Sequence, residues 1–149
     1  MKTLYDPATA DEIKSRIAKL TPESPRQWGK MTAPQALAHC AIALQAPLGD
    51  TAPSRVMIGR LIGWMFKPVF TNEKEFGKNA PTHPSYIVTS PCDLDRERAR
   101  LSALIDRFVA MGPEACSKHP HSFFGKLAGA EWGIGMYKHL HHHLRQFGV

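Results

Sequence analysis

Four of the eight histidines in this 149-residue sequence fall within five consecutive positions near its C-terminal end. Imidazole nitrogen is the commonest metal ligand in proteins and a frequent general acid or base. On a helix, where each residue advances by about 100°, His143 lies inside an apolar stripe and His139 at its edge. His141 and His142 point away, toward a polar side shared with Lys138. The stripe consists of Trp132, Met136, Leu140, Leu144 and Phe147.

His139 and His143 are four residues apart, so a helix stacks them one turn apart on the same face. Two imidazoles at that spacing can ligate one metal ion, as the HxxxH part of the zinc-protease motif does. The complete HExxH motif is absent, so that protease mechanism has no support. Taken alone, HxxxH is better explained by a pair of surface or core-edge histidines.

A third histidine, His39, lies in the middle of an alanine-rich apolar segment. Burying an imidazole costs free energy unless the ring finds a partner. A metal ion would serve, and so would a backbone carbonyl or a carboxylate, so both interpretations stay open. Cys40 is adjacent, but successive helical residues diverge by about 100°, so the two side chains do not easily face one ion.

The elements that position these histidines are predicted to be helices. Hydrophobic periodicity, caps and breakers place four main helices and one short apolar helix over residues 7–20, 32–46, 56–66, 93–111 and 129–147. Asp6 or Thr9 caps the first of them. Thr32 and Gln35 have the capping-box spacing at the start of the second, and Asp93 is a cap for the fourth.

Residues 67–91, rich in Pro, Asn, Gly and Thr, form a long crossover, with an extended fragment expected near 86–88. Gly112 and Pro113 are predicted to end the helix that precedes them. The fold class is therefore all-α. We expect a single domain over residues 1–149, a four-helix bundle whose long crossover carries a short extra helix.

Composition narrows the class of protein. With 43% hydrophobic and 21% charged residues, the chain has enough apolar residues for a core and is not disordered. The longest apolar stretch, 56–70, is broken by two cations and is shorter than the roughly 20 residues of a membrane span. The start lacks a signal-peptide pattern, and Cys40, Cys92 and Cys116 suggest neither disulfides nor a thiolate site. We expect a cytoplasmic protein with no membrane partner.

The formal net charge of +6 would suit nucleic acid or an anionic substrate. The basic residues are scattered, however, and acids alternate with bases over residues 93–107. A mixed, solvated surface explains this pattern better than a nucleic-acid stripe does, so no nucleic-acid partner is expected.

Several motifs together resemble the DinB/YfiT-like superfamily of metal-binding bundles. They are a mid-helix histidine, His39, downstream of Trp28, the segment Phe-Phe-Gly-Lys-Leu at 123–127, Glu-Trp-Gly at 131–133, and a final histidine-rich helix. The closer match is an uncharacterised branch of that superfamily.

This resemblance implies a bundle, often dimeric, in which one histidine of the second helix and two of the last hold a metal ion. Those positions are His39, His139 and His143. The chain departs from the branch in having Ser122 after the loop histidine, and in lacking the Thr-Pro-Glu-Glu cap of the last helix, which weakens that cap by about 1 kcal/mol.

Three imidazoles leave a coordination position open, as in catalytic zinc sites. The ion, most simply zinc or nickel, would act as a Lewis acid or lower the pKa of bound water or thiol. The resemblance points to a transferase or isomerase that uses a low-molecular-weight thiol on a small-molecule substrate. Activation of water at the same metal would instead give a hydrolase. Glu131 and His121 are weaker candidates for catalytic residues, while His83 and His119 are expected to be surface histidines.

A second hypothesis comes from a different class. The chain is then a non-catalytic dimerisation or partner-binding protein whose histidines are structural. Catalysis predicts bound metal and an open cavity beside it. Partner binding predicts an exposed apolar patch, around Ile62 and Phe66.

Overall fold

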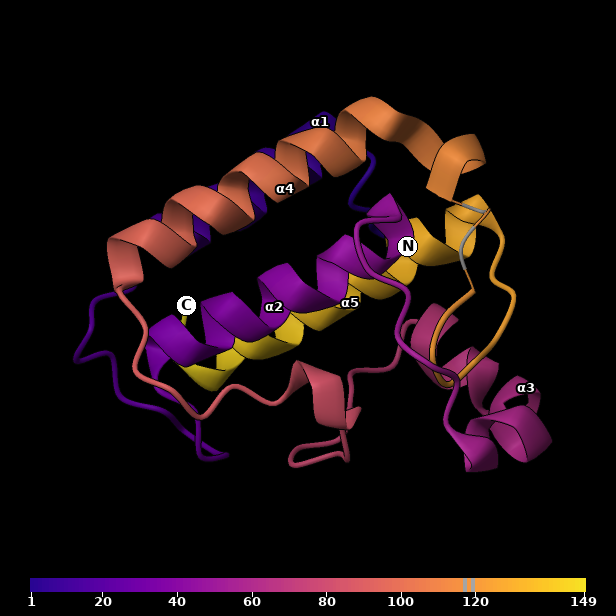
Figure 1. Cartoon of the computed structure of the whole chain (residues 1–149). Coiled ribbons are helices and arrows are strands. Elements are labelled where there is room, and N and C mark those ends of the chain that lie inside the picture. The colour runs from indigo at the N-terminus through magenta and orange to yellow at the C-terminus, as the bar shows by residue number, and fades with distance from the viewer. Residues whose placement is uncertain (117, 119) are drawn as a thin grey trace.

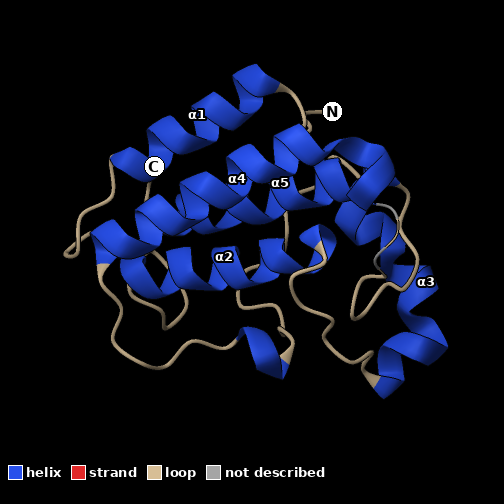
Figure 2. Ribbon diagram, turned by 45° about the horizontal axis from the view of Figure 1, so that its top comes forward, coloured by secondary structure: helices blue, strands red, loops and turns tan. Residues whose placement is uncertain are grey.

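The computed structural model describes residues 1–116, 118 and 120–149, and in this part of the chain all regular structure is helical (Figures 1 and 2). No β-strand occurs among the described residues. The elements are α1 (Pro7–Ala18), α2 (Ala33–Leu48), α3 (Met57–Thr71), the 3-10 helix η1 (Pro84–Tyr86), α4 (Leu94–Cys116) and α5 (Gly129–Gln146). The prediction of an all-helical chain is confirmed.

Helices α1, α2, α4 and α5 form the bundle, and α3 lies at one corner of it (Figure 1). α2 and α5 lie side by side in both views and run in opposite directions (Figure 2). A hydrogen bond from the Gln27 N–H to the Gln146 carbonyl, 2.7 Å long, joins the segment before α2 to the end of α5. Two helices far apart in the sequence, α2 and α5, are thereby neighbours in the bundle.

The predicted caps are present at three helix starts. Asp6 accepts a hydrogen bond from the Ala8 N–H, and the Thr32–Gln35 capping box is complete in both directions. Asp93 accepts from the Arg96 N–H at the start of α4. Each side chain satisfies a first-turn N–H that has no partner inside its helix.

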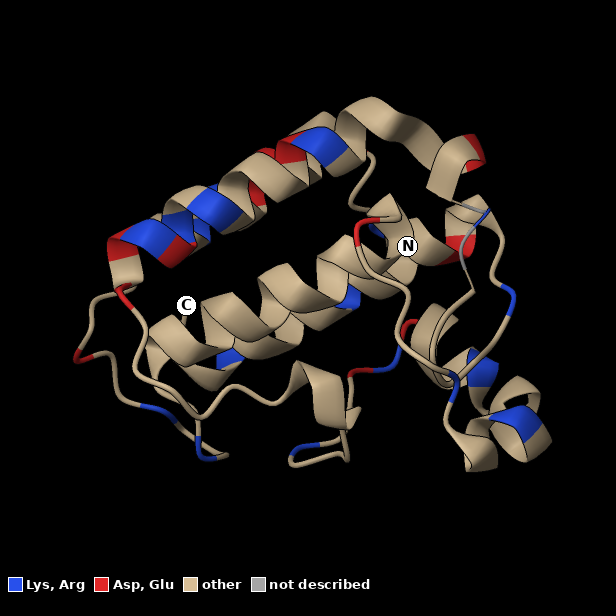
Figure 3. Ribbon diagram, viewed as in Figure 1, with Lys and Arg blue, Asp and Glu red and all other residues tan. Residues whose placement is uncertain are grey.

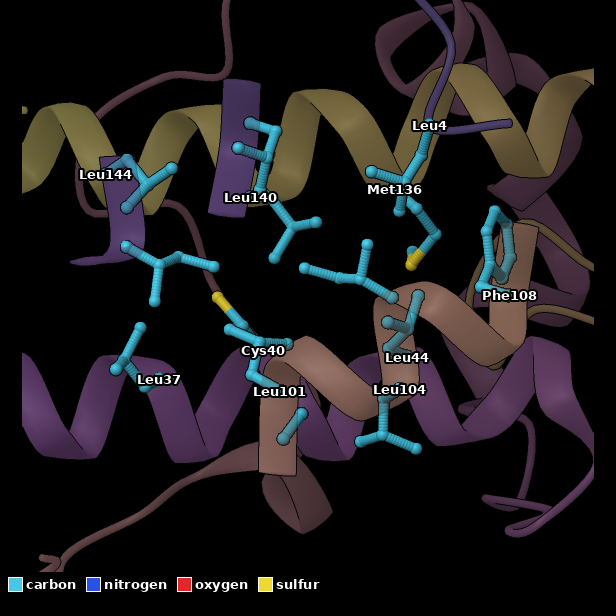
Figure 4. Packing of buried hydrophobic residues seen from close by; sticks show 14 of the residues in the cluster. Leu4, Leu37, Cys40, Leu44, Leu101, Leu104, Phe108, Met136, Leu140 and Leu144 are labelled. Carbon is cyan, nitrogen blue, oxygen red and sulfur yellow. The ribbon is translucent and has the colours of Figure 1, made fainter. Parts of the chain in front are cut away.

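The core lies between α2, α4 and α5, with α1 closing one side (Figure 4). It consists of leucine, isoleucine and alanine side chains with a few larger rings, of which Trp132 and Phe108 are fully buried. Cys40 points into this core beside Leu101 and Leu37 (Figure 4). Burial raises the pKa of its thiol, so Cys40 is an apolar packing residue rather than a nucleophile.

Two boundaries differ from the predicted ones, and a third is confirmed. α3 extends to Thr71, beyond the expected end at Phe66, because Phe70 is buried against Trp132 and holds the last turn on the bundle. Gly112 breaks α4 as predicted, because its φ of 73° is not helical, and one more helical turn then follows to Cys116. The expected extended fragment at 86–88 begins as the last residue of η1.

α3 contacts the bundle through two glycines. A Cβ at Gly59 would lie 2.6 Å from the carbonyl oxygen of Phe123, and one at Gly63 would overlap the same oxygen. The α3 backbone therefore touches the backbone of the 121–125 loop directly. Among the residues that the structure describes, no helix is long and apolar enough to cross a membrane.

Candidate metal centre

α2 carries His39 in its middle, facing α5. The ring is 3% exposed, and it lies between the capping box at the start of the helix and Gly49, whose left-handed backbone (φ 80°) ends the helix. Because α2 is buried along most of its length, the His39 side chain has a fixed direction. Its Nε2 atom lies 3.0 Å from Nε2 of His139.

α5 supplies the other two imidazoles. His139 and His143 lie one turn apart, with ring centroids 4.8 Å from each other and 5.0 and 4.7 Å from the His39 ring. Ligand nitrogens of the three residues all lie within 4.8 Å of one another. His39 is buried, while His139 and His143 keep some exposed surface. The structure thus brings together the three histidines that the sequence singled out.

The backbone of η1 fixes the proton of His39. Nδ1 lies 2.7 Å from the Tyr86 carbonyl oxygen. A carbonyl can only accept, so Nδ1 of this ring carries the hydrogen and the neutral ring keeps a lone pair on Nε2. That lone pair points toward His139. The same arrangement, a ring N–H held by a carbonyl, orients the histidine ligands of metal proteins.

A side-chain amide does the same for His143. Nδ1 lies 2.9 Å from Oε1 of Gln146, whose Nε2 donates to the Trp28 carbonyl at 2.8 Å. The Trp28 carbonyl therefore sets which way the amide faces, and Gln146 presents an acceptor to His143. The Nε2 atom of His143 is left with its lone pair.

One family model, described as "Protein of unknown function (DUF1569)", matches residues 5–148. The chain belongs to the DUF1569 family. The match covers all three clustered histidines and the residues that hold them, so the site lies within the family's own domain. No curated protein and no solved structure matches the chain.

Burial keeps the three rings of this DUF1569 chain neutral near pH 7. Desolvation lowers the pKa of His39, despite the opposing hydrogen bond to Tyr86. Desolvation, with His39 and His142 nearby, lowers the pKa of His143 to about 3. Burial, followed by the charges of neighbouring imidazoles, holds the pKa of His139 well below its usual value. Neutral imidazole is the form that binds a metal.

His141 and His142 lie outside the cluster, as their helical phase predicts. Nδ1 of His141 contacts the Arg16 guanidinium, 2.8 Å away. The His142 ring lies against Trp28 and Phe76. These contacts tie α5 to the chain around it.

Lys138 departs from the prediction that it lies on the polar side. It is buried, and its ammonium donates to the Val69 carbonyl and to Asn72 at the end of α3. The crossover after α3 folds back over α5 and covers the face that carries Lys138, which would otherwise be exposed to solvent.

A surface cavity of about 190 Å³ lies over α5 beside His142. Trp28, Phe76 and Lys138 line it together with His142. The His142 ring also faces His143, with centroids 5.1 Å apart. None of the three clustered histidines lines this cavity.

The two weaker candidates have structural partners. Glu131 accepts from the Ala128 N–H in the first turn of α5 and pairs with Lys67 at 2.7 Å. This favours its interpretation as a helix-start charge, two turns from His139. Nδ1 of His121 accepts from the N–H groups of Phe123 and Phe124 and so holds the 121–125 turn.

Two further histidines were expected at the surface. His83 contacts Ser85 and the Ser54 carbonyl in the crossover, and His119 lies outside the described residues.

Sequence reasoning missed the groups that orient the ligands. Gln146 follows His143 by three residues, a spacing at which side chains on a helix contact each other. Its hydrogen bond to His143 could therefore have been predicted from the sequence. Tyr86 of η1 and Trp28 in the loop before α2 act through their backbone carbonyls. Every residue type has that group, so the sequence does not indicate this role.

Proposed function

We propose that this DUF1569 chain is a metal-dependent enzyme whose metal is held by His39, His139 and His143. One observation supports this most directly. Three neutral imidazoles converge from two helices, and two of them have the proton fixed on the outer nitrogen by an oxygen acceptor. Three protein ligands leave a coordination position for water or substrate. The metal would lower the pKa of a water or thiol bound at that position toward neutrality.

The chain's own groups support the proposal in other ways. The Tyr86 carbonyl and the Gln146 amide hold the rings in place, so little ordering remains to be done on binding. The cavity beside His142 has room for a small molecule. The resemblance to thiol-dependent bundles favours a low-molecular-weight thiol as the activated group, with a small electrophile as substrate. Three free cysteines suit a cytoplasmic setting.

The second candidate function is partner binding without catalysis. The observation in its favour is an apolar face on α3 that includes Phe66 at 45% exposure. A homodimer through such a face would agree with the resemblance. Because the face and the histidine cluster lie in different parts of the molecule, the two functions can be tested separately.

The test is the metal content of tag-free protein purified without a nickel column. We expect close to one metal per chain, lost in His39→Ala and in His143→Ala. His142→Ala and His141→Ala are the matched controls, because these neighbours on α5 lie outside the cluster. A metal-free protein that also fails to take up added zinc or nickel would overturn the proposal.

Thiol use has its own measurement. Calorimetric titration of the metal-loaded protein with a small thiol should give one site per chain, with a proton released as the thiolate forms. The same titration of the His143→Ala protein is the control. An absence of thiol binding by the loaded wild type would leave water as the activated group.

A further inference from the structure

α3 turns its smallest residues inward and its large apolar side chains outward. Its buried residues are Gly59, Gly63 and Phe70. The exposed large apolar residues of the helix are Met57 (83%), Ile58, Leu61 (73%), Trp64 (70%), Met65, Phe66 and Val69. A helix that only completes a core shows the opposite arrangement. Of these outward side chains, Phe66 contacts the Phe123 ring, and the others remain largely exposed to solvent.

The exposed side chains form one continuous face. At about 100° per residue, Trp64, Met57, Leu61, Met65, Ile58 and Val69 follow one another around the helix without a polar residue between them. We call these six residues the α3 face. Arg60 and Lys67 share the flank between the α3 face and the glycine side. The helix is therefore amphipathic, with its apolar face turned away from the bundle and toward the surroundings of the protein.

The charged residues of α3 itself are all basic. Residues 51–72 contain Arg55, Arg60 and Lys67 but no Asp or Glu, and the ribbon of α3 carries only basic colour in Figure 3. Lys67 pairs with Glu131 of α5, while Arg60 is exposed. Lys126 is also exposed, on the loop next to the turn that contacts α3. The net charge of the whole chain is +6.

We propose that α3 is an interfacial helix that binds the surface of an anionic lipid bilayer. An apolar face with Trp and Leu, flanked by cations, lies in the headgroup plane with its apolar side chains in the acyl boundary. Trp64 is the residue type that prefers this interface. The helix lies on the membrane and does not cross it, which agrees with the lack of a spanning helix among the described residues.

A second copy of the chain fits the α3 face less well. In a two-fold dimer each face meets itself, and the other copy's α3 then offers Arg60 no carboxylate, because the helix contains no Asp or Glu. The expectation of no membrane partner came from the lack of a spanning segment, and that concerns crossing alone. The inference does not depend on whether the histidines hold a metal.

The test is co-sedimentation with phosphatidylcholine vesicles, with and without phosphatidylglycerol. We expect binding to the anionic vesicles, weakened about tenfold or more by Leu61→Glu, because a buried leucine contributes strongly to such binding. Arg60→Glu should weaken binding to the anionic vesicles only. Ile87→Glu is the matched control, since Ile87 is 57% exposed but lies off α3. Trp64 fluorescence should shift to the blue on binding.

Two results would overturn the inference. One is equal sedimentation of wild type and Leu61→Glu. The other is a lipid-free dimer, seen by sedimentation velocity, that Leu61→Glu dissociates, because it assigns the α3 face to a second copy. Circular dichroism and metal content of each variant separate these results from misfolding and from loss of the histidine site.

Discussion

At the scale of single residues, two oxygen atoms decide what the histidine cluster can do. The Tyr86 carbonyl and Oε1 of Gln146 each take the Nδ1 hydrogen of one ring. Both rings then present Nε2 lone pairs to the same small volume. A site with the same three histidines but without these acceptors would sample both tautomers and several ring orientations.

Gln146→Met tests this role. Methionine keeps the length of the side chain but cannot accept from His143, so we expect zinc affinity to fall about 10–100-fold. Competition against a chromophoric chelator measures it. The control is Gln45→Met, because Gln45 contacts Arg100 on the opposite side of α2. Unchanged affinity in a folded Gln146→Met protein would remove Gln146 from the site.

His121 should make stability depend on pH. Burial lowers its pKa to about 4, below the ordinary value near 6.5. The unfolded chain therefore binds the proton first, and stability is lost as the pH falls from about 6.5 to about 4. The loss attributable to His121 is about 3 kcal/mol.

His121→Asn isolates this contribution. The asparagine oxygen can still accept from the turn N–H groups but does not titrate. Urea unfolding at several pH values from 7 to about 4 should show a shallower slope for the variant than for wild type. The other histidines titrate in both proteins, so equal slopes would mean that His121 is not the source.

At the scale of elements, most of the fold could be predicted because its signals are local. Thr32, Gln35 and Asp93 cap helices with neighbours three residues away, and the apolar stripe of α5 sorted His139 from His141 by phase alone. Contacts between distant segments could not be read in this way. Phe70 lengthens α3 through its contact with Trp132, and Tyr86 reaches His39 from a crossover without periodicity.

The contact between α3 and the 121–125 loop depends on glycine. Gly63→Ala places a Cβ against the Phe123 carbonyl oxygen, so we expect α3 to shift outward and stability to fall by about 1–3 kcal/mol. Trypsin should then cleave faster after Arg60, whereas the bond after Lys67 precedes Pro68 and resists trypsin in every variant. Gly77→Ala is the control, because nothing lies within 4 Å of a Cβ there. Identical cleavage of the two variants would contradict this packing.

At the scale of the whole molecule, a metal on this site would connect two helices that already pack together. Ligand binding only to the folded state adds stability, about 2.7 kcal/mol at a hundred times the dissociation constant. For a chain of this size that is a rise in Tm of about 5–10 °C. Calorimetry with and without zinc should show the rise in wild type and in His142→Ala. The same rise in His39→Ala would place the zinc elsewhere.

The contact between His39 and His139 joins residues 100 positions apart. Closing so long a loop costs entropy before any contact repays it, so the histidine cluster forms late in folding, after the local helices and their caps. Interactions absent from the transition state slow unfolding without hastening folding. An ion on these histidines would therefore extend the lifetime of the folded chain and leave its folding rate unchanged.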